Sequence, residues 1–378
     1  MASEMLYPIM PIYLKEIGFS ILLIGILEGV AEATAGLSKG YFGKRSDTAG
    51  KRAPFVQLGY AFSAISKPMM ALFIYPLWIF FARTMDRLGK GIRTGARDAL
   101  LSDETNAENK ARVFGFHRSM DTLGAVFGPL LALIYLYFYP KDYRTLFFIA
   151  FIPGLLSILA TFLLKEKKRA VEFKNESVAF FSFLGYWKES PERYRKLLIG
   201  LLAFTLINSS DIFLLLKAKD AGLDDSQVIG VYIFYNLVYA VFAYPLGIRA
   251  DKIGLKKMFL IGILLFAFVY LGMALSTDLY MIIGCFFLYG IYAAATEGIS
   301  KAWISNICEK KDTATAIGTY SAFQSLFALL ASSVAGLVWY GFGAQAVFLM
   351  SALGAILVFF YIALFVAKRP KMESLSQE

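Results

Sequence analysis

A short pattern that occurs in both halves of the chain constrains the fold more than any other feature. The spacing Gly-x-x-x-Asp-x-x-Gly occupies residues 43–50 and returns 204 residues later at 247–254, each time between two long apolar runs. A period longer than half the chain indicates two copies of one large unit, not a solenoid of small repeats. The fixed positions are Gly43, Asp47 and Gly50, and then Gly247, Asp251 and Gly254.

The apolar runs are long enough to cross a membrane. Hydrophobic residues make up 58% of the 378 residues, charged residues make up 17%, and the mean hydropathy is +0.60. A soluble chain of this length cannot bury so much apolar surface, and most runs exceed the roughly 20 residues that a membrane helix needs. We predict twelve spans, at 2–14, 20–42, 54–74, 77–101, 112–138, 145–164, 197–216, 226–248, 257–276, 279–304, 314–340 and 345–367.

The predicted fold is an all-α polytopic membrane protein with two pseudo-symmetric six-helix bundles. We place the bundles at 1–164 and 197–367, with a linker at 165–196 and a tail at 368–378. The Phe-rich middle of the linker, Val178 to Trp187, could lie flat on the membrane as an amphipathic segment. Internal repeats of this kind are typical of secondary transporters.

The first span is shorter than its counterpart. Adding 204 to Glu4 gives Asn208, which lies well inside the seventh span. The first helix is therefore expected either to be unusually short or to lack about seven residues before Met1, by comparison with the repeat.

The basic residues predict the orientation. Lys44, Lys51, Arg249, the linker and the tail place most Lys and Arg on one side of the membrane. The positive-inside bias then makes both termini and the linker cytoplasmic, in a cytoplasmic (inner) membrane of bacterial type. This bias also explains the net charge of +10 without a nucleic-acid partner.

Together these residues resemble the major facilitator superfamily. The 43–52 stretch resembles its loop motif after the second helix, and Arg83 resembles its buried arginine in the fourth. Gly124, Gly128 and Pro129 resemble the Gly-x-x-x-Gly-Pro motif of exporters in the fifth. The stretch 86–98 resembles a bacterial subgroup labelled only as transporters. The resemblance implies a monomer whose halves rock about a site lined by the first, fourth, seventh and tenth helices.

The fourth predicted helix carries an unusual stripe of charge at 3/4 spacing. Charges in the membrane cost several kcal/mol unless they are paired or hydrated, so the stripe should face the interior. It is either a surface that binds an anionic or zwitterionic group, with Arg83 bidentate, or an internal network in which Asp86 pairs with Lys90. A third possibility places Arg93 to Asp98 at the cytoplasmic surface. The members are Arg83, Asp86, Arg87, Lys90, Arg93 and Arg97.

Acids on other helices are expected to meet this stripe. Burial favours the neutral form of a carboxylate, which suits it to take and release protons; the alternative is that each acid only neutralises an arginine. Candidates for proton coupling are Glu4, Glu28, Glu32, His117 and Asp121, where His117 and Asp121 share a helix face, and His117 could also be an inert interfacial residue. Candidates for substrate contact, besides the stripe, are Asp211, Glu297 and Lys301.

Other residues are expected to control conformation. The resemblance implies a latch in which Asp47 engages the basic end of the fourth helix, at Arg93 and Arg97, and the start of the eleventh; Gly43, Gly50 and Asp251 belong to the same latch. Gly124 and Gly128 predict close helix packing with a gating role, and Pro129 permits a bend.

We expect a proton-coupled exporter of a small charged solute, anionic or zwitterionic. The alternatives are a proton-independent uniporter or exchanger of an anionic metabolite, a divalent-metal exporter, and a scaffold or scramblase. No phosphate-binding loop, metal cluster or cofactor motif is apparent, and Cys285 and Cys308 do not suggest a disulfide framework, so an enzyme is not expected.

Overall fold

The structure, a computed structural model, describes residues 1–7, 9–164, 166 and 178–366. The predicted tail at 368–378 and the part of the linker at 167–177 lie outside this range. Within it the chain is helical, and the helices are α1 (Ala2–Leu6), α2 (Met10–Glu16), α3 (Ile21–Thr48), α4 (Ala53–Leu72), α5 (Pro76–Asp103), α6 (Lys110–Phe138), α7 (Tyr143–Thr161), η1 (Ser182–Gly185), α8 (Tyr186–Glu189), α9 (Glu192–Ile207), α10 (Ile212–Asp220), α11 (Asp225–Ile253), α12 (Leu255–Leu275), α13 (Leu279–Ile307), η2 (Lys310–Asp312) and α14 (Thr313–Phe365).

The twelve predicted spans correspond to these elements. Pairing α1 with α2 and α9 with α10, and dividing α14 where Gly343 leaves helical geometry at φ 83°, gives twelve spans in the described chain. Seven segments of the described chain meet a length and hydropathy criterion for membrane crossing. The charged helix α5 is not among them. The fold is that of a twelve-helix bundle.

The first and seventh spans are each interrupted, which the prediction of twelve spans did not include. The first is broken between Leu6 and Met10, and the seventh between Ile207 and Ile212. The second break falls on Asn-Ser-Ser-Asp, side chains that compete for backbone hydrogen bonds and so oppose a helix interior. In the 204-residue frame Tyr7 corresponds to Asp211, so the two breaks overlap in the repeat.

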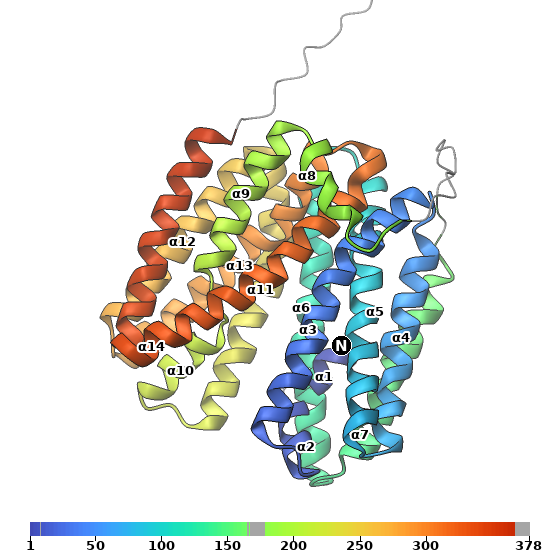
Figure 1. Cartoon of the computed structure of the whole chain (residues 1–378). Helices are drawn as coiled ribbons and strands as arrows, with labels where there is room; N and C mark the ends of the chain where they lie inside the picture. Colours follow the sequence, from blue (N-terminus) through green and yellow to red (C-terminus); the bar gives the residue numbers. More distant parts are fainter. Residues whose placement is uncertain (8, 165, 167–177, 367–378) are drawn as a thin grey trace, which may run out of the picture.

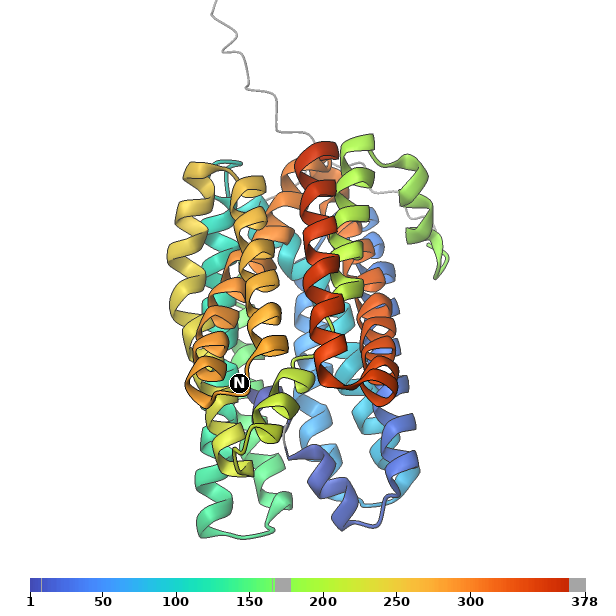
Figure 2. The same cartoon turned by 90° about the vertical axis from the view of Figure 1, so that its left-hand side faces the viewer.

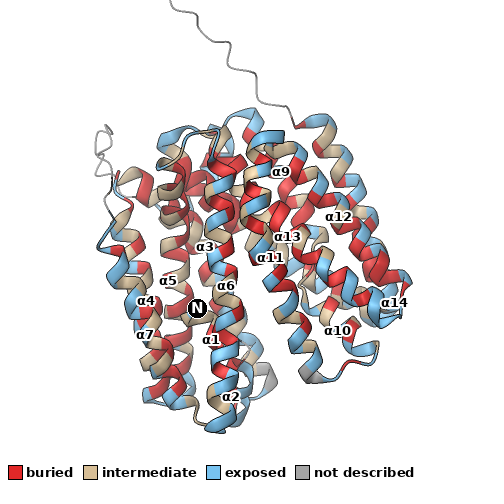
Figure 3. Cartoon of the chain, turned by 180° about the vertical axis from the view of Figure 1, so that it is seen from behind, coloured by how far each residue is buried: buried red, intermediate tan, exposed pale blue. Residues whose placement is uncertain are grey.

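The spans form two bundles, α1–α7 and α9–α14, which we call the N-terminal and C-terminal bundles (Figure 1). Two seams join them, one between α3 and α14 and the other between α6 and α11. Buried residues line the faces where helices meet, and exposed residues cover the outside (Figure 3). The exposed side chains include many large apolar ones, as expected for a surface that faces lipid.

The end of the molecule that carries residues 178–192 and the last turn of α14 is called the linker end. There α9 lies beside the C-terminal part of α14 in two views at right angles (Figure 1, Figure 2). Tyr361 donates a hydrogen bond to the Lys196 carbonyl at 3.2 Å. Away from the linker end the ribbons of the two bundles diverge (Figure 1).

The Phe-rich middle of the linker packs on protein. Phe183 is 1% exposed, and its ring lies over Gly40 of α3, where an added Cβ would stand 2.6 Å from the ring. The Thr319 hydroxyl of α14 donates to the Phe183 carbonyl at 3.4 Å, and Lys44 Nζ donates to the Ser182 carbonyl at 3.0 Å. The segment therefore covers the first seam at the linker end, while Phe181 remains 58% exposed.

Candidate functional site

The first glycine of each repeat lets two helices cross at a seam. A Cβ at Gly43 would stand 2.4 Å from the Ala314 carbonyl oxygen, and one at Gly318 would stand 2.4 Å from that of Lys39. The second seam repeats the arrangement: Cβ atoms at Gly115 and Gly247 would stand 2.5 Å from carbonyl oxygens of the partner helix. Such approaches are possible only without side chains.

The acid of each repeat caps a helix of the other bundle. Asp47 Oδ2 accepts hydrogen bonds from Thr315 N at 2.7 Å and from the Thr315 hydroxyl at 2.9 Å, at the start of α14. Asp251 accepts from Ala111 N at 3.0 Å and Arg112 N at 2.8 Å, at the start of α6. A carboxylate satisfies the free N–H groups of a helix start and is favoured by its dipole.

The last glycine of each repeat turns the chain. Gly50 has φ 62° and Gly254 has φ 99°, both in the region that L side chains rarely adopt. Each of the three repeated positions therefore has a structural role: a helix crossing, a helix cap and a turn. Of the partners expected for Asp47, the start of the eleventh span is found. The structure also pairs Asp47 with Arg52 at 3.1 Å.

Arg93 and Arg97, the basic residues expected to meet Asp47, contact other side chains. Arg93 donates to the Ser63 hydroxyl at 2.6 Å, and its guanidinium lies 4.7 Å from the Tyr60 ring centre. Arg97 pairs with Asp98 at 3.0 Å, and the second Asp98 oxygen accepts Lys301 Nζ at 2.5 Å. Asp98 is fully buried, and Arg93 and Arg97 are partly buried, so this part of α5 packs inside the protein.

The α5 stripe faces inward and forms an ion-pair network. Glu28 binds Arg83 through two contacts, at 2.7 Å to Nε and 2.9 Å to NH2. Arg87 Nε lies 3.2 Å from Glu32. Arg83 and Arg87 are 4% and 5% exposed. These two arginines are therefore already engaged by carboxylates.

The pairing expected for Asp86 was wrong, because a residue missed in the sequence takes the place of Lys90. Lys67 of α4 is 1% exposed and pairs with Asp86 at 2.6 Å, while Arg83 lies 3.4 Å from the second Asp86 oxygen. A single Lys in an apolar run was the available signal, since an unpaired cation in the membrane is costly. Its partner could not be read from local spacing.

Basic side chains outnumber acids in this network. α3, α4 and α5 together carry nine Lys or Arg and six Asp or Glu, a surplus of three basic residues. Six of the basic residues belong to this network, and its three carboxylates are those of Glu28, Glu32 and Asp86. Lys90 has no carboxylate within 4 Å in the described chain. Lys39 donates to the Ser325 hydroxyl at 3.0 Å, at the first seam. The basic members are Lys39, Lys67, Arg83, Arg87, Lys90 and Arg93.

A cavity of about 330 Å³ lies between α1, α6, α11, α13 and the break after α9. It is lined by polar and aromatic side chains, and its charged members are Glu4, Asp121, Asp211, Glu297 and Arg118. Arg118 links two of these acids, because it pairs with Asp121 at 3.1 Å and with Glu297. Tyr239 donates a second hydrogen bond to Glu297 at 3.0 Å.

Asp211 lies at the helix break and is held by hydroxyl groups. Tyr235 and Ser210 donate hydrogen bonds to it. The tyrosines around it were not predicted, because aromatic residues in an apolar span are equally typical of lipid-facing positions. They are Tyr232, Tyr235, Tyr239 and Tyr289.

The remaining predicted residues lie on α6. A Cβ at Gly124 would stand 2.7 Å from Met1 N, and one at Gly128 would stand 2.8 Å from Met5 N, so this face packs against α1. Pro129 is buried inside the continuous helix. His117 is half-buried, one turn before Asp121.

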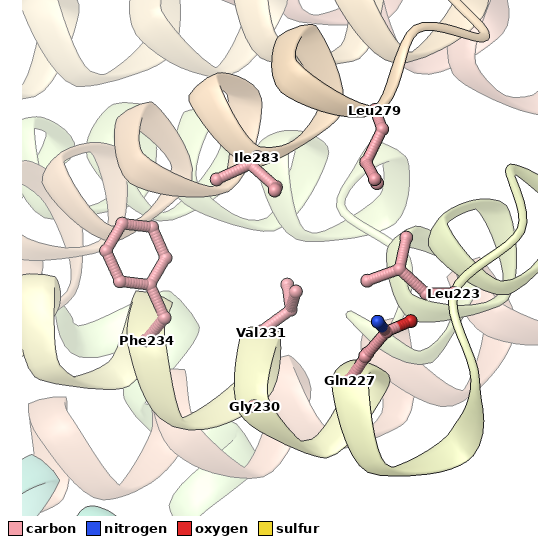
Figure 4. A pocket seen from close by; sticks show the side chains of 7 residues that line it. All are labelled: Leu223, Gln227, Gly230, Val231, Phe234, Leu279 and Ile283. Carbon is pink, nitrogen blue, oxygen red and sulfur yellow. The ribbon is translucent and has the colours of Figure 1, made fainter.

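A second cavity of about 330 Å³ opens between α11 and α13 at the end away from the linker (Figure 4). Its lining carries no charged side chain among the described residues; Leu223, Phe234, Leu279 and Ile283 supply apolar surface. It is therefore unsuited to a charged solute.

The arrangement of two repeated bundles around central charges agrees with comparisons to known proteins. The family model of the Major Facilitator Superfamily matches residues 1–235 and 197–378. The chain belongs to the major facilitator superfamily. It is 33% identical to an uncharacterised MFS-type transporter of Methanocaldococcus jannaschii, over 90% of this chain and 85% of that one. It is 26% identical to the inner membrane transport protein YajR of Escherichia coli, over 96% of this chain and 79% of that one.

Solved structures agree on the fold. The human organic anion transporter MFSD10 superposes with a TM-score of 0.79 at 18% identity, over 96% of this chain and 95% of that one. The chain is thus a membrane-embedded secondary transporter of the superfamily, a family of transporters and not, in general, of enzymes.

Proposed function

We propose that the chain moves a small charged organic solute across the cytoplasmic membrane by alternating access, and that the solute carries an anionic group. The observation that carries this proposal is the surplus of three basic side chains in the network of α3, α4 and α5, where six basic residues accompany three carboxylates. A surplus of cations near the membrane centre is costly unless an anion compensates it.

Lys39 and Lys90 are the proposed contacts for the anionic group. Arg83 was the first candidate from the sequence, but its guanidinium is already held by two Glu28 contacts, so its proposed role is to position Glu28. Lys90 lacks a carboxylate within 4 Å among the described residues. Its ammonium group is therefore the best placed to gain a partner when an anion enters.

Proton coupling is proposed to run through Glu4. Glu28, Glu32 and Asp121 each pair with an arginine, at 2.7, 3.2 and 3.1 Å, so protonating one of them would break an ion pair. Glu4 lines the central cavity and has no basic side chain within 4 Å in the described part of the chain. It can accept a proton without such a loss.

The proposed orientation follows the basic loops, with the linker end in the cytoplasm and the direction of transport outward. The seam contacts join the bundles at that end, so the described state would be closed toward the cytoplasm. Export is supported by the Gly-x-x-x-Gly-Pro stretch of α6, the feature that this chain shares with exporters of the family.

A ligand screen tests the anionic group. Purified protein is heated with matched anionic, cationic and zwitterionic solutes at pH 6 and pH 8. A solute at about a hundred times its Kd should add about 2.7 kcal/mol to the free energy of unfolding. We expect solutes with an anionic group to stabilise the wild type and the exposed-site control Lys15→Gln, but not Lys90→Gln. If Lys90→Gln responds like the wild type, the basic surplus is structural and the proposal fails.

Transport in proteoliposomes tests the coupling. A solute found in the screen should drive proton movement that a pH-sensitive dye reports, and Glu4→Gln should abolish the proton signal while leaving counterflow of the solute. Proton movement that persists in Glu4→Gln would contradict the assignment of Glu4.

A further inference from the structure

The central cavity beside the C-terminal bundle has an excess of negative charge, opposite to that of the α5 network. Four carboxylates and one guanidinium line it. Arg118 is shared by Asp121 and Glu297, which leaves Glu4 and Asp211 without a basic partner within 4 Å in the described chain. The cavity is thus suited to a positive group.

The helix break after α9 adds two uncharged polar side chains to this cavity, those of Asn208 and Ser209. Asn208 Nδ2 donates to the Tyr292 hydroxyl at 2.8 Å, which leaves Asn208 Oδ1, buried and without a hydrogen-bond partner among the described residues. Ser209 is 5% exposed and lines the same cavity. Buried polar groups normally find partners, so Asn208 Oδ1 is an acceptor that lacks a donor among the described residues.

Aromatic rings surround the same acid. The rings of Tyr232 and Tyr235 lie 5.4 Å apart at 81°, and those of Tyr235 and Tyr289 lie 5.3 Å apart at 77°. All three line the cavity that contains Asp211. A cation is attracted to the face of an aromatic ring, and the attraction is stronger in a site shielded from water.

The geometry points to a site for a protonated amine in this cavity. The ammonium N–H groups donate hydrogen bonds to Asp211 and to Asn208 Oδ1, and the tyrosine rings surround the positive charge. This inference rests on the proposed function and extends it: the solute carries an amine as well as the anionic group bound by the basic side chains of α3 and α5. The solute class is therefore zwitterionic.

Fragments that carry one charge each test the two sites separately. Butylammonium chloride and sodium butyrate are titrated against the purified protein at equal ionic strength, with sodium chloride as reference, and the apparent Kd is taken from the shift in Tm. We expect butylammonium to stabilise the wild type. Asp211→Asn should weaken its apparent Kd by about tenfold or more, because a charged hydrogen-bond acceptor is lost. Asp220→Asn, an exposed acid at the end of the same short helix, should leave it unchanged.

Ring variants keep the test decisive if Asp211→Asn does not fold. Tyr232→Leu should weaken butylammonium binding and Tyr232→Phe should preserve it, because only the ring face is required. The amine site is refuted if butylammonium gives no shift beyond sodium chloride, or if its affinity is the same in Asp211→Asn or Tyr232→Leu as in the wild type. If butyrate binding is unaffected by Lys90→Gln while butylammonium still depends on Asp211, the amine site stands and the proposed anion contact fails.

Discussion

Asp98 of α5 and Lys301 of α13 form an ion pair between the two bundles, with 2.5 Å between Oδ2 and Nζ. Their side chains are 1% and 14% exposed, and Arg97 binds the other Asp98 oxygen at 3.0 Å. Because α5 and α13 belong to different bundles, separating the bundles at this level must break the pair. It adds an electrostatic contact to the two helix caps.

Asp98→Asn should destabilise the protein by about 3 kcal/mol, since it leaves the partly buried Arg97 and Lys301 without their carboxylate. Lys301→Met should cost less, because Asp98 keeps Arg97. The free energy of unfolding in mixed micelles measures both, and the double variant gives the coupling between them. Lys311→Met, which removes an exposed partner of Glu309, should change stability by less than about 0.5 kcal/mol. Equal losses from Asp98→Asn and Lys311→Met would contradict this role.

Gly43→Ala should shift the protein toward states open at the linker end, because the new Cβ would stand 2.4 Å from the Ala314 carbonyl oxygen. Spin labels at the exposed residues 108 and 309, one in each bundle at the linker end, report the distance between the bundles. Cys285 and Cys308 are replaced by Ser so that only these two sites are labelled. A longer distance is expected for Gly43→Ala. Gly29→Ala on the same helix meets open space and should leave the distance unchanged. An unchanged distance in both variants would show that the seam tolerates the Cβ.

Phe183→Ala should open the same end, because the ring fills the space over Gly40 and is buried. Removing a buried phenylalanine typically costs about 3–5 kcal/mol. Here the loss of stability falls on the state in which the linker covers the first seam. The spin-label pair and the Tm both report the effect. Phe181→Ala, two residues earlier and 58% exposed, is the matched control and should have little effect. A similar Tm loss in both variants would mean that the linker acts only by general packing.

Lys67→Met should destabilise the N-terminal bundle by about 3 kcal/mol, because it leaves Asp86 with only the longer contact to Arg83. Lys67→Arg keeps the charge and should recover part of the loss. Thermal unfolding in detergent measures both, with Lys15→Met as an exposed control. If Lys67→Met proves as stable as the wild type, the pair with Asp86 does not stabilise the bundle.

The sequence was sufficient for the features that repeat or that depend on apolar length. The spans, the division near Gly343 and the engagement of Asp47 with the start of the eleventh span all follow from the 204-residue frame and the family resemblance. The breaks at 7–9 and 208–211 were missed, because apolar runs continue on both sides of them. The pairing of Lys67 with Asp86 depends on the rotation of α4 against α5, which local spacing does not encode.

The central cavity was foreseen only in part. Its acids were noticed because charges are rare in membrane spans, and Asp211 and Glu297 were placed near the centre by the family's arrangement. The tyrosines were not, because an aromatic ring in an apolar span suits lipid, a protein core and a binding site equally well. Only the packing of α11 against α13 directs these side chains to one cavity.

The exchange of contacts at the seams has a consequence for the origin of the molecule. Each bundle gives one glycine crossing and one capping acid to its partner, and receives the same pair in return. An interface in which residue i of one unit meets residue j of the other, and the reverse, is the isologous contact of a twofold homodimer. A single six-helix unit carrying both features already has a self-complementary surface. Two separate copies of it would close on each other as these bundles do, before any linker joined them.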